Sequence, residues 1–390
     1  MIGFDAALAL LEANVRPLSA EPVPLAEAHG RVLAKDVRAA LPSPRSAVSA
    51  MDGYALRNAD AAVGARLRIV GESFAGGTPP PGIAPGECVR IFTGAPMPKG
   101  ADRVVMQENC VGDGKAMTIT AEFGPGWHVR PAASDFAAGD LLLRAGTRLG
   151  PGAIVALAGA DRAEAMVHKR PRLAIIATGD ELAPPGTARD HPDRIPESVS
   201  FGVAALAEQY GANIVARLSG ADDLGTLRQL ADKALAQANV VVVTGGASVG
   251  ERDFAKAMFA EQDLELLFAK VVIKPGKPVW IGRAQGRWIV GLPGNPTSAL
   301  VTARLFLAPL LALLQGRALA EVQTWLPLPL GDGFPDSGDR TTFVRARLSG
   351  GMLIPVGNQD SGAQAPLAAA GWLVRCERDS ALAGRLALTF

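Results

Sequence analysis

The sequence predicts a multidomain α/β protein in which a doubly wound αβα sandwich is joined to a β insert domain, a discontinuous helical domain and a C-terminal β-barrel-like domain. Two observations support this fold class. Between residues 170 and 317, unbroken apolar runs alternate with helical segments, which is typical of parallel strands buried on both faces. Elsewhere, short β-type runs lie between Gly and Pro clusters, which predicts smaller β domains. The apolar runs are Leu173–Ala177, Val240–Val243 and Trp288–Leu292, and the helical segments are Ser200–Tyr210 and Thr226–Ala238.

The discontinuous helical domain is predicted from two separated helical patterns. Apolar residues recur at helical spacing over Phe4–Val15, and a Pro-rich boundary follows at residues 41–45. A helical pattern returns over residues 150–168. We therefore expect residues 1–46 and 132–168 to pack together as one domain that is interrupted by an insert.

The other domains follow from the remaining patterns. Residues 47–131 are predicted to form the β insert domain, residues 169–317 the α/β domain and residues 318–390 the C-terminal β domain. The β-type runs are Leu67–Val70, Cys88–Phe92 and Ala116–Thr120 in the insert, and Thr342–Leu348 and Gly371–Arg378 in the C-terminal domain.

Composition excludes several classes of function. Lys and Arg number 39 and Asp and Glu 38, so the chain lacks the basic balance expected of a nucleic-acid-binding protein. The three cysteines form no C-x-x-C pair, which favours a reducing compartment over disulfides or a thiolate zinc site. The apolar segment Leu305–Leu314 is shorter than a membrane span and is predicted to be a buried helix. We expect a cytoplasmic protein that binds neither nucleic acid nor membrane.

The three apolar runs end in similar glycine-containing turns, at Thr178–Glu181, Thr244–Ser248 and Leu292–Pro296. In an open parallel sheet, ligands collect beyond the carboxyl ends of the strands, where small residues let backbone N–H groups approach an anion. A single turn of this kind is better explained by a tight strand-to-helix connection, which favours glycine. Three of them together predict a ligand site at this edge.

Acidic residues are concentrated near the same edge, and they need a positive counterpart if the ligand is a phosphate. A phosphate about 4 Å from an unpaired carboxylate is repelled by roughly 1 to 4 kcal/mol. Magnesium is one candidate counterpart, and the lysines around the Pro275–Gly276 bend are the other. Two simpler readings stay open: Asp222–Asp223 as a helix cap before Leu224, and the lysines as solvated surface groups. The acids are Asp180, Glu181, Asp222, Asp223 and Asp253, and the lysines are Lys270, Lys274 and Lys277.

Six linked motifs, in order and spanning nearly the whole chain, resemble the molybdopterin molybdenumtransferases, the family that includes bacterial MoeA and the gephyrin E domain. From spacing alone, Met51–Tyr54 and Thr93–Gly94 read as turns, so their function depends on this resemblance. The motifs are Ser49–Ala55, Thr93–Pro98, Thr178–Leu182, Gly245–Gly250, Ile273–Pro278 and Gly291–Pro296.

The resemblance implies an elongated, four-domain homodimer with a molybdopterin-binding α/β domain. Its site is expected between the αβα domain of one subunit and the β insert of the other. The implied reaction inserts molybdate into adenylylated molybdopterin, and magnesium-dependent cleavage of the pyrophosphate releases AMP. Implied partners are the upstream molybdopterin adenylyltransferase and downstream maturation factors of molybdoenzymes.

The site residues are carried over position by position. Three of the catalytic carboxylates, Glu181, Asp222 and Asp253, are also the implied metal ligands. The implied catalytic residues are Asp52, Thr93, Asp135, Glu181, Asp222, Asp253, Lys270 and Lys274, and the implied binding residues are Gly245, Gly246, Ser248, Lys277, Pro293, Asn295 and Pro296.

The sequence departs from the family pattern where polar residues are usual, at Val48, Pro131–Ser134, Val199 and Gly220–Ala221. These changes leave an alternative open: a paralogue that binds or carries the finished cofactor without making it. A third reading, a scaffold that docks partners through its C-terminal domain, has no independent support in the sequence.

Overall fold

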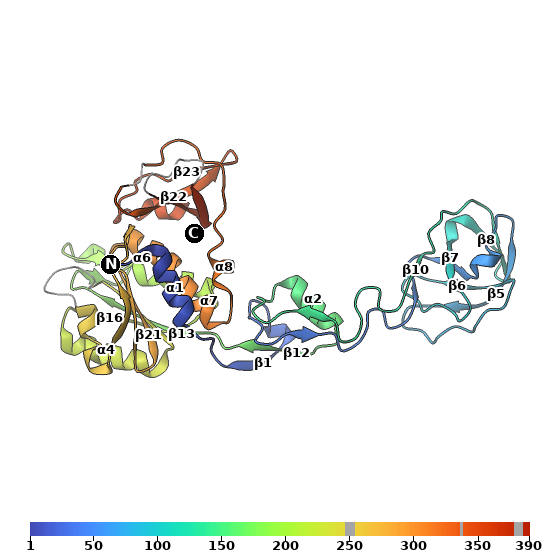
Figure 1. Ribbon diagram of the computed structural model, residues 1–390, viewed down its shortest axis with the longest axis horizontal. Helices are drawn as coiled ribbons and strands as arrows, with labels where there is room; N and C mark the ends of the chain where they lie inside the picture. The colour runs from blue at the N-terminus through green and yellow to red at the C-terminus, as the bar shows by residue number, and fades with distance from the viewer. Residues whose placement is uncertain (246–253, 336–337, 378–384) are drawn as a thin grey trace.

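A computed structural model describes residues 1–245, 254–335, 338–377 and 385–390. The molecule is elongated (Figure 1). The αβα domain and the C-terminal β domain lie side by side at one end, a narrow linker domain lies in the middle, and the β insert domain lies at the far end.

The αβα domain is built on a six-stranded sheet of order β16-β13-β17-β21-β20-β18. The first four strands are mutually parallel, as predicted from the apolar runs, whereas β20 and β18 are antiparallel to their neighbours. The strand β16, next to β13, was not predicted. The bounds are β13 Arg172–Thr178, β16 Asn213–Gly220, β17 Val240–Thr244, β18 Glu265–Ala269, β20 Trp280–Ala284 and β21 Arg287–Leu292.

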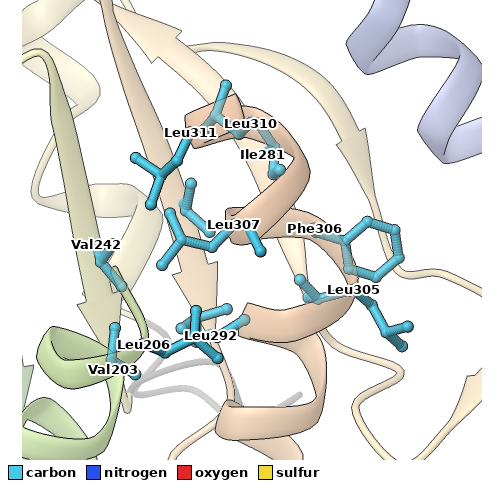
Figure 2. Close-up of a cluster of buried hydrophobic side chains, with 14 of the residues drawn as sticks. Val203, Leu206, Val242, Ile281, Leu292, Leu305, Phe306, Leu307, Leu310 and Leu311 are labelled. Carbon is cyan, nitrogen blue, oxygen red and sulfur yellow. The ribbon is translucent and has the colours of Figure 1, made fainter. Parts of the chain in front are cut away.

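Helices cover both faces of this sheet, so all four valines of β17 are fully buried. Val240 and Val242 face the layer formed by α3, Val199–Gln209, and the helical segment Pro296–Leu314. Val241 and Val243 face α4, Leu224–Gln237, and α5, Phe254–Ala257. Figure 2 shows part of the first of these clusters, to which Leu305, Phe306, Leu307, Val242 and Leu292 all belong.

The segment Pro296–Leu314 consists of α6, Pro296–Thr302, the π-helical turn η6, Ala303–Leu307, and α7, Ala308–Leu314. It is the one helix of the described chain that is long and apolar enough to span a membrane, but 94% of its apolar window is buried inside the protein. The predicted buried helix at Leu305–Leu314 is therefore confirmed.

The linker domain contains more strand than the sequence predicted. Only the first half of residues 150–168 is helical, as α2, Pro151–Gly159. Glu164–His168 is instead strand β12, because Ala165 and Val167 alternate with exposed or half-buried neighbours and pack inward. Two strand pairs lie in the linker domain. Strand β1, Ala20–Pro24, pairs with β12, and strand β2, Val37–Arg38, pairs with β11, Leu141–Leu143.

The first helix also belongs elsewhere than predicted. Helix α1, Phe4–Asn14, buries its apolar face in the core of the αβα domain rather than in the linker domain. Phe4 lies 5.7 Å from Phe306 and 5.0 Å from Phe343 between ring centroids, so α1 contacts the C-terminal domain as well.

The insert domain is a six-stranded sheet of order β7-β4-β6-β5-β9-β8, joined to the linker by the pair β3–β10. The strands predicted at residues 67–70, 88–92 and 116–120 are confirmed as parts of β5, β6 and β9. The bounds are β3 Val48–Ser49, β4 Gly53–Leu56, β5 Arg66–Ser73, β6 Glu87–Ile91, β7 Arg103–Met106, β8 Cys110–Gly112, β9 Ala116–Ile119 and β10 Val129–Arg130.

The C-terminal domain is a five-stranded sheet that takes one strand from the αβα segment. Strand β19, Ile273–Lys274, pairs in parallel with β22, Thr341–Ser349. This pairing fixes the lysine-bearing bend against the C-terminal domain. The other strands are β23 Met352–Pro355, β24 Trp372–Cys376 and β25 Leu386–Thr389.

Candidate functional site

The glycine-containing ends of the parallel strands meet at one point of the sheet edge. Gly245 has φ of +90°, and a Cβ atom at this position would lie 2.4 Å from the carbonyl oxygen of Thr178. A Cβ at Gly294 would lie 3.4 Å from the Cα of Gly245. The ends of β13, β17 and β21 are therefore in contact, and Gly245 is the residue that permits it.

A crevice of about 310 Å³ opens beside this contact point. Four of the predicted site residues line it, namely Glu181, Gly245, Asn295 and Pro296. Pro293 is buried directly before Gly294. The remaining lining residues are Thr178, Leu182, Ile195, Pro196, Glu197, Ser198, Val199, Thr244, Gly294, Gly362 and Gln364.

The turn after β13 directs Glu181 back over its own backbone. Gly179 has φ of +149°, and a Cβ there would lie 2.7 Å from Oε2 of Glu181. The carbonyl oxygen of Glu181 accepts a hydrogen bond from the backbone N–H of Ile195 at 2.7 Å. A glycine at position 179 is thus needed for the exposed carboxylate to take this position.

The two aspartates after β16 have different roles. The backbone N–H of Asp222 donates to Oδ1 of Asp180 at 3.0 Å, so the acids at the ends of β16 and β13 are neighbours. Asp223 caps α4, because its Oδ2 accepts from the backbone N–H of Thr226 at 2.8 Å. The hydrogen bonds from Thr226 hold the pKa of Asp223 below its ordinary value. The helix-cap reading therefore applies to Asp223, whereas Asp222 lies at the end of β16 beside Asp180 and lines neither the crevice nor the other cavities described.

A second cavity of about 680 Å³ lies between the αβα and C-terminal domains. The exposed side chains of Lys274 and Lys277 line it together with Arg340. Lys270 lines neither cavity, although it is exposed near the start of the same segment with φ of +61°. The lysine cluster of the sequence thus resolves into a pair at the cavity and one lysine outside it.

A loop of the C-terminal domain, residues 358–364, forms the wall shared by the two cavities. The amide of Asn295 donates to the hydroxyl of Ser361 at 2.9 Å, and the backbone N–H of Thr297 donates to the carbonyl of Ser361 at 3.2 Å. The αβα and C-terminal domains therefore share this wall through direct hydrogen bonds.

Arg345 holds this loop from below and was missed by the sequence analysis. Its side chain is 1% exposed and donates to the carbonyl oxygens of Asn358, Asp360 and Ala363 and to the hydroxyl of Thr297. Burial lowers its pKa. An arginine inside the apolar run Phe343–Ala346 was the available signal, since a buried arginine requires several acceptors.

The predicted site residues of the insert domain lie at the opposite end of the molecule (Figure 1). Oδ1 of Asp52 accepts hydrogen bonds from the backbone N–H and the hydroxyl of Thr93, both at 2.7 Å. These bonds lower the pKa of Asp52. The absence of a side chain at Gly53, directly after Asp52, permits the close approach of β4 to β7, because a Cβ there would lie 2.1 Å from the carbonyl oxygen of Val105. Asp135 is exposed on the loop that returns from the insert to the linker, where its backbone N–H donates to Ser43.

Three predicted site residues, Gly246, Ser248 and Asp253, lie outside the described residues. Within the part of the chain that the structure describes, no three His, Cys, Asp or Glu side chains are grouped as a metal site. Glu181 and Asp222 remain the described members of the predicted metal ligands.

Comparison with known proteins decides the family. The molybdopterin molybdenumtransferase of Nostoc sp. is 35% identical over 336 residues, which is 84% of this chain and 77% of that protein. The chain belongs to the molybdopterin molybdenumtransferase family. A family member from Haemophilus influenzae is 35% identical over 309 residues, covering 79% of this chain and 76% of the relative. These relatives are transferases, so the family assignment makes the chain a transferase of molybdenum cofactor biosynthesis.

Family models and a solved structure agree with this assignment to the molybdenumtransferases. The MoeA N-terminal region (domain I and II) matches residues 2–160, the probable molybdopterin binding domain residues 174–313 and the MoeA C-terminal region (domain IV) residues 327–385. The crystal structure of the molybdopterin biosynthesis MoeA protein from Pyrococcus horikoshii has a TM-score of 0.85 at 26% identity, with complete coverage of both chains.

Proposed function

We propose that the chain inserts molybdate into adenylylated molybdopterin and releases AMP, in a magnesium-dependent reaction. The observation that supports this most directly is the convergence of the strand ends: Glu181, Gly245 and Asn295 line one crevice. A crevice at the carboxyl edge of a parallel sheet suits a phosphorylated ligand. The turn at Gly245 lets the backbone approach the pyrophosphate, and Asn295 orients the bound ligand from the neighbouring turn after β21.

The carboxylates at the ends of the parallel strands fit magnesium, which prefers carboxylate oxygens together with phosphate oxygens of a substrate. Glu181 and Asp222, with Asp253, would hold the ion. Bound magnesium would neutralise the charge of the pyrophosphate. Without this counterion, the carboxylates of Glu181 and Asp222 would repel the phosphates. Glu181 and Asp222 would therefore orient the phosphates through the ion that they hold.

The second cavity is the proposed entry site for molybdate. Lys274, Lys277 and Arg340 bring three positive groups to its wall, and Asp360 is the acidic side chain that lines it. Molybdate is a dianion, so this charge balance favours its binding. The wall of residues 358–364 separates it from the crevice, which places the two substrates on either side of one loop.

We also propose that the functional unit is a cytoplasmic homodimer. In a single chain, Asp52 and Thr93 lie at the far end from the crevice (Figure 1). If they act on the same ligand as Glu181, a second copy must supply them. The proposed partners are the adenylyltransferase that supplies the adenylylated ligand and maturation factors that accept the product.

To test the reaction, the purified protein is incubated with adenylylated molybdopterin, molybdate and magnesium, and AMP release and bound molybdenum are measured. Glu181→Gln should reduce AMP release by on the order of a hundredfold and lower bound molybdenum with it. Asp190→Asn, a change of an exposed acid on the neighbouring loop, should retain both. Absence of AMP above a buffer control with the wild-type chain would contradict the proposal.

A second candidate function is a carrier of finished cofactor. Val199, where the family usually has asparagine, is 8% exposed and lines the crevice, so one polar contact to a ligand is missing there. Tight retention of mature cofactor without turnover would favour the carrier. Restoring the contact with Val199→Asn should then increase AMP release.

A further inference from the structure

The linker-facing end of the insert domain, next to the β3–β10 pair, carries a row of planar side chains beside the Asp52–Thr93 pair. The rings of Phe74 and Phe92 are stacked, with centroids 4.8 Å apart and planes inclined by 12°. The guanidinium carbon of Arg90 lies 4.8 Å from the Phe92 centroid and 5.0 Å from the Tyr54 centroid. We call Phe74, Phe92, Arg90 and Tyr54 the aromatic row.

The row is fixed to the turn that presents Asp52. Arg90 Nη1 donates to the carbonyl oxygen of Gly53 at 2.9 Å, and Nη2 donates to the side chain of Gln107. Phe92 directly precedes Thr93, and its backbone N–H donates to Ser73 at 3.2 Å. Asp52, Thr93 and the row therefore lie together at the neighbouring strands β4, β6 and β5, whose pairing holds them in one surface.

The end of the row is open. Phe74 is 49% exposed although Phe92 covers one of its faces, so the uncovered face lies toward solvent. An exposed aromatic face held parallel to a second ring is a preorganised stacking surface. Packing within the insert core explains the position of Tyr54 only, since Phe74 and Phe92 are not part of that core, which includes Leu56, Leu67 and Met117.

We infer that the aromatic row binds a planar heterocycle of the ligand, with Phe74 as the stacking ring and Arg90 as the positioning residue. The inference rests on the proposed function, in which Asp52 and Thr93 meet the ligand held in the partner's crevice. Adenylylated molybdopterin contains two planar heterocycles, adenine and the pterin. Both present π faces, and stacking on an aromatic ring is tolerant of which base is bound.

The test compares Phe74→Leu, which keeps apolar area but removes the ring face, with Phe74→Tyr, which keeps the ring. Calorimetry measures the affinity of the full chain for its ligands in two arms. The first arm compares AMP with ribose 5-phosphate, which lacks the base, and the second arm measures molybdopterin. In at least one arm, Phe74→Leu should weaken binding about tenfold, within the range for losing one base–aromatic stack. Binding of ribose 5-phosphate should not change. Phe74→Tyr and Val63→Ala, an exposed apolar residue of the same domain, should retain wild-type affinities.

The arm that weakens identifies the heterocycle: AMP for adenine, molybdopterin for the pterin. Unchanged affinity of Phe74→Leu in both arms overturns the inference, as does an equal loss for Phe74→Tyr. In turnover, Phe74→Leu should raise the KM for the adenylylated ligand and leave the KM for molybdate unchanged. The binding measurements do not depend on turnover. If the chain binds AMP through Phe74 but produces no AMP from the adenylylated ligand, the proposed reaction is contradicted and the stacking site is not.

Discussion

At the crevice, glycines let the ends of three strands meet, whereas in the insert the predicted site consists of side chains held by hydrogen bonds beside the β3–β10 pair. A Cβ at Gly245 would lie 2.4 Å from the carbonyl oxygen of Thr178, whereas a Cβ at Gly294 would make only an ordinary contact with Gly245. In the insert, Oδ1 of the half-buried Asp52 accepts two hydrogen bonds from the exposed Thr93. We therefore expect the crevice to be sensitive to atoms added at Gly245. The insert site should be sensitive mainly to the loss of individual hydrogen-bonding groups.

The largest expected effect comes from combining one change in each region. Glu181→Gln and Asp52→Asn should each reduce AMP release by on the order of a hundredfold, the scale of losing one electrostatic contact to a reacting phosphate. Equal amounts of the two variants, reassembled together, should recover about a quarter of wild-type activity, because half of the dimers are mixed and each holds one intact site.

No recovery above the single variants would show that the two regions do not share a ligand across subunits. Wild-type protein taken in parallel through the same reassembly is the control for losses of activity during mixing.

Gly245→Ala should affect both stability and activity. The new Cβ would lie 2.4 Å from the carbonyl of Thr178 in a backbone of positive φ. We expect a loss of about 2 to 3 kcal/mol in the free energy of unfolding, measured by denaturant titration. Gly286→Ala is the matched control, since φ is +73° and no atom lies within 4 Å of its Cβ. An equal cost at both positions would mean that backbone strain alone is responsible.

Arg345→Met should lower the melting temperature and loosen the wall of residues 358–364. Four acceptors lose their donor, which costs about 2 to 4 kcal/mol when they remain buried. Arg347→Met, on the same strand but exposed, should change stability little. Protease cleavage within the loop of Arg345→Met, but not of Arg347→Met, would locate the defect.

The smallest effect concerns the pKa of Asp52. The bonds from Thr93 lower it from an ordinary value of 3.8, so their stabilisation is present above that value and is lost as pH falls through the lowered pKa. Thr93→Val keeps the stronger backbone bond and removes the hydroxyl bond. The pKa of Asp52, followed by NMR, should rise toward the ordinary value without reaching it. No shift would contradict the hydroxyl bond.

The central sheet was predictable because its signals are local. The runs at Leu173, Val240 and Trp288 are long enough for burial on both faces, and their glycine turns mark the ligand edge. The contributions that cross domains were not predictable. Nothing within residues 1–14 shows that α1 packs on the αβα core, and nothing around Lys274 shows that β19 pairs with the C-terminal domain. Such contacts depend on tertiary packing rather than periodicity.

The candidate site divides in the same way. Glu181 and Gly245 could be placed at one edge because parallel strands bring their carboxyl ends together. The separation of Lys270 from Lys274 and Lys277 could not, since the three share one short segment of the sequence. The wall formed by Ser361 and Arg345 comes from the C-terminal domain, in which no motif indicated a ligand.

The linker domain also determines how far the insert can reach. The chain leaves and returns through paired short strands, β1 with β12, β2 with β11 and β3 with β10. A two-stranded antiparallel ribbon advances about 3.3 Å per residue, so its residue count acts as a ruler between the two ends of the molecule. Removing one residue from each of the two strands would displace the insert domain by more than the length of a hydrogen bond. The number of residues in this arm, and not their chemistry, then sets the alignment of any site that two copies share.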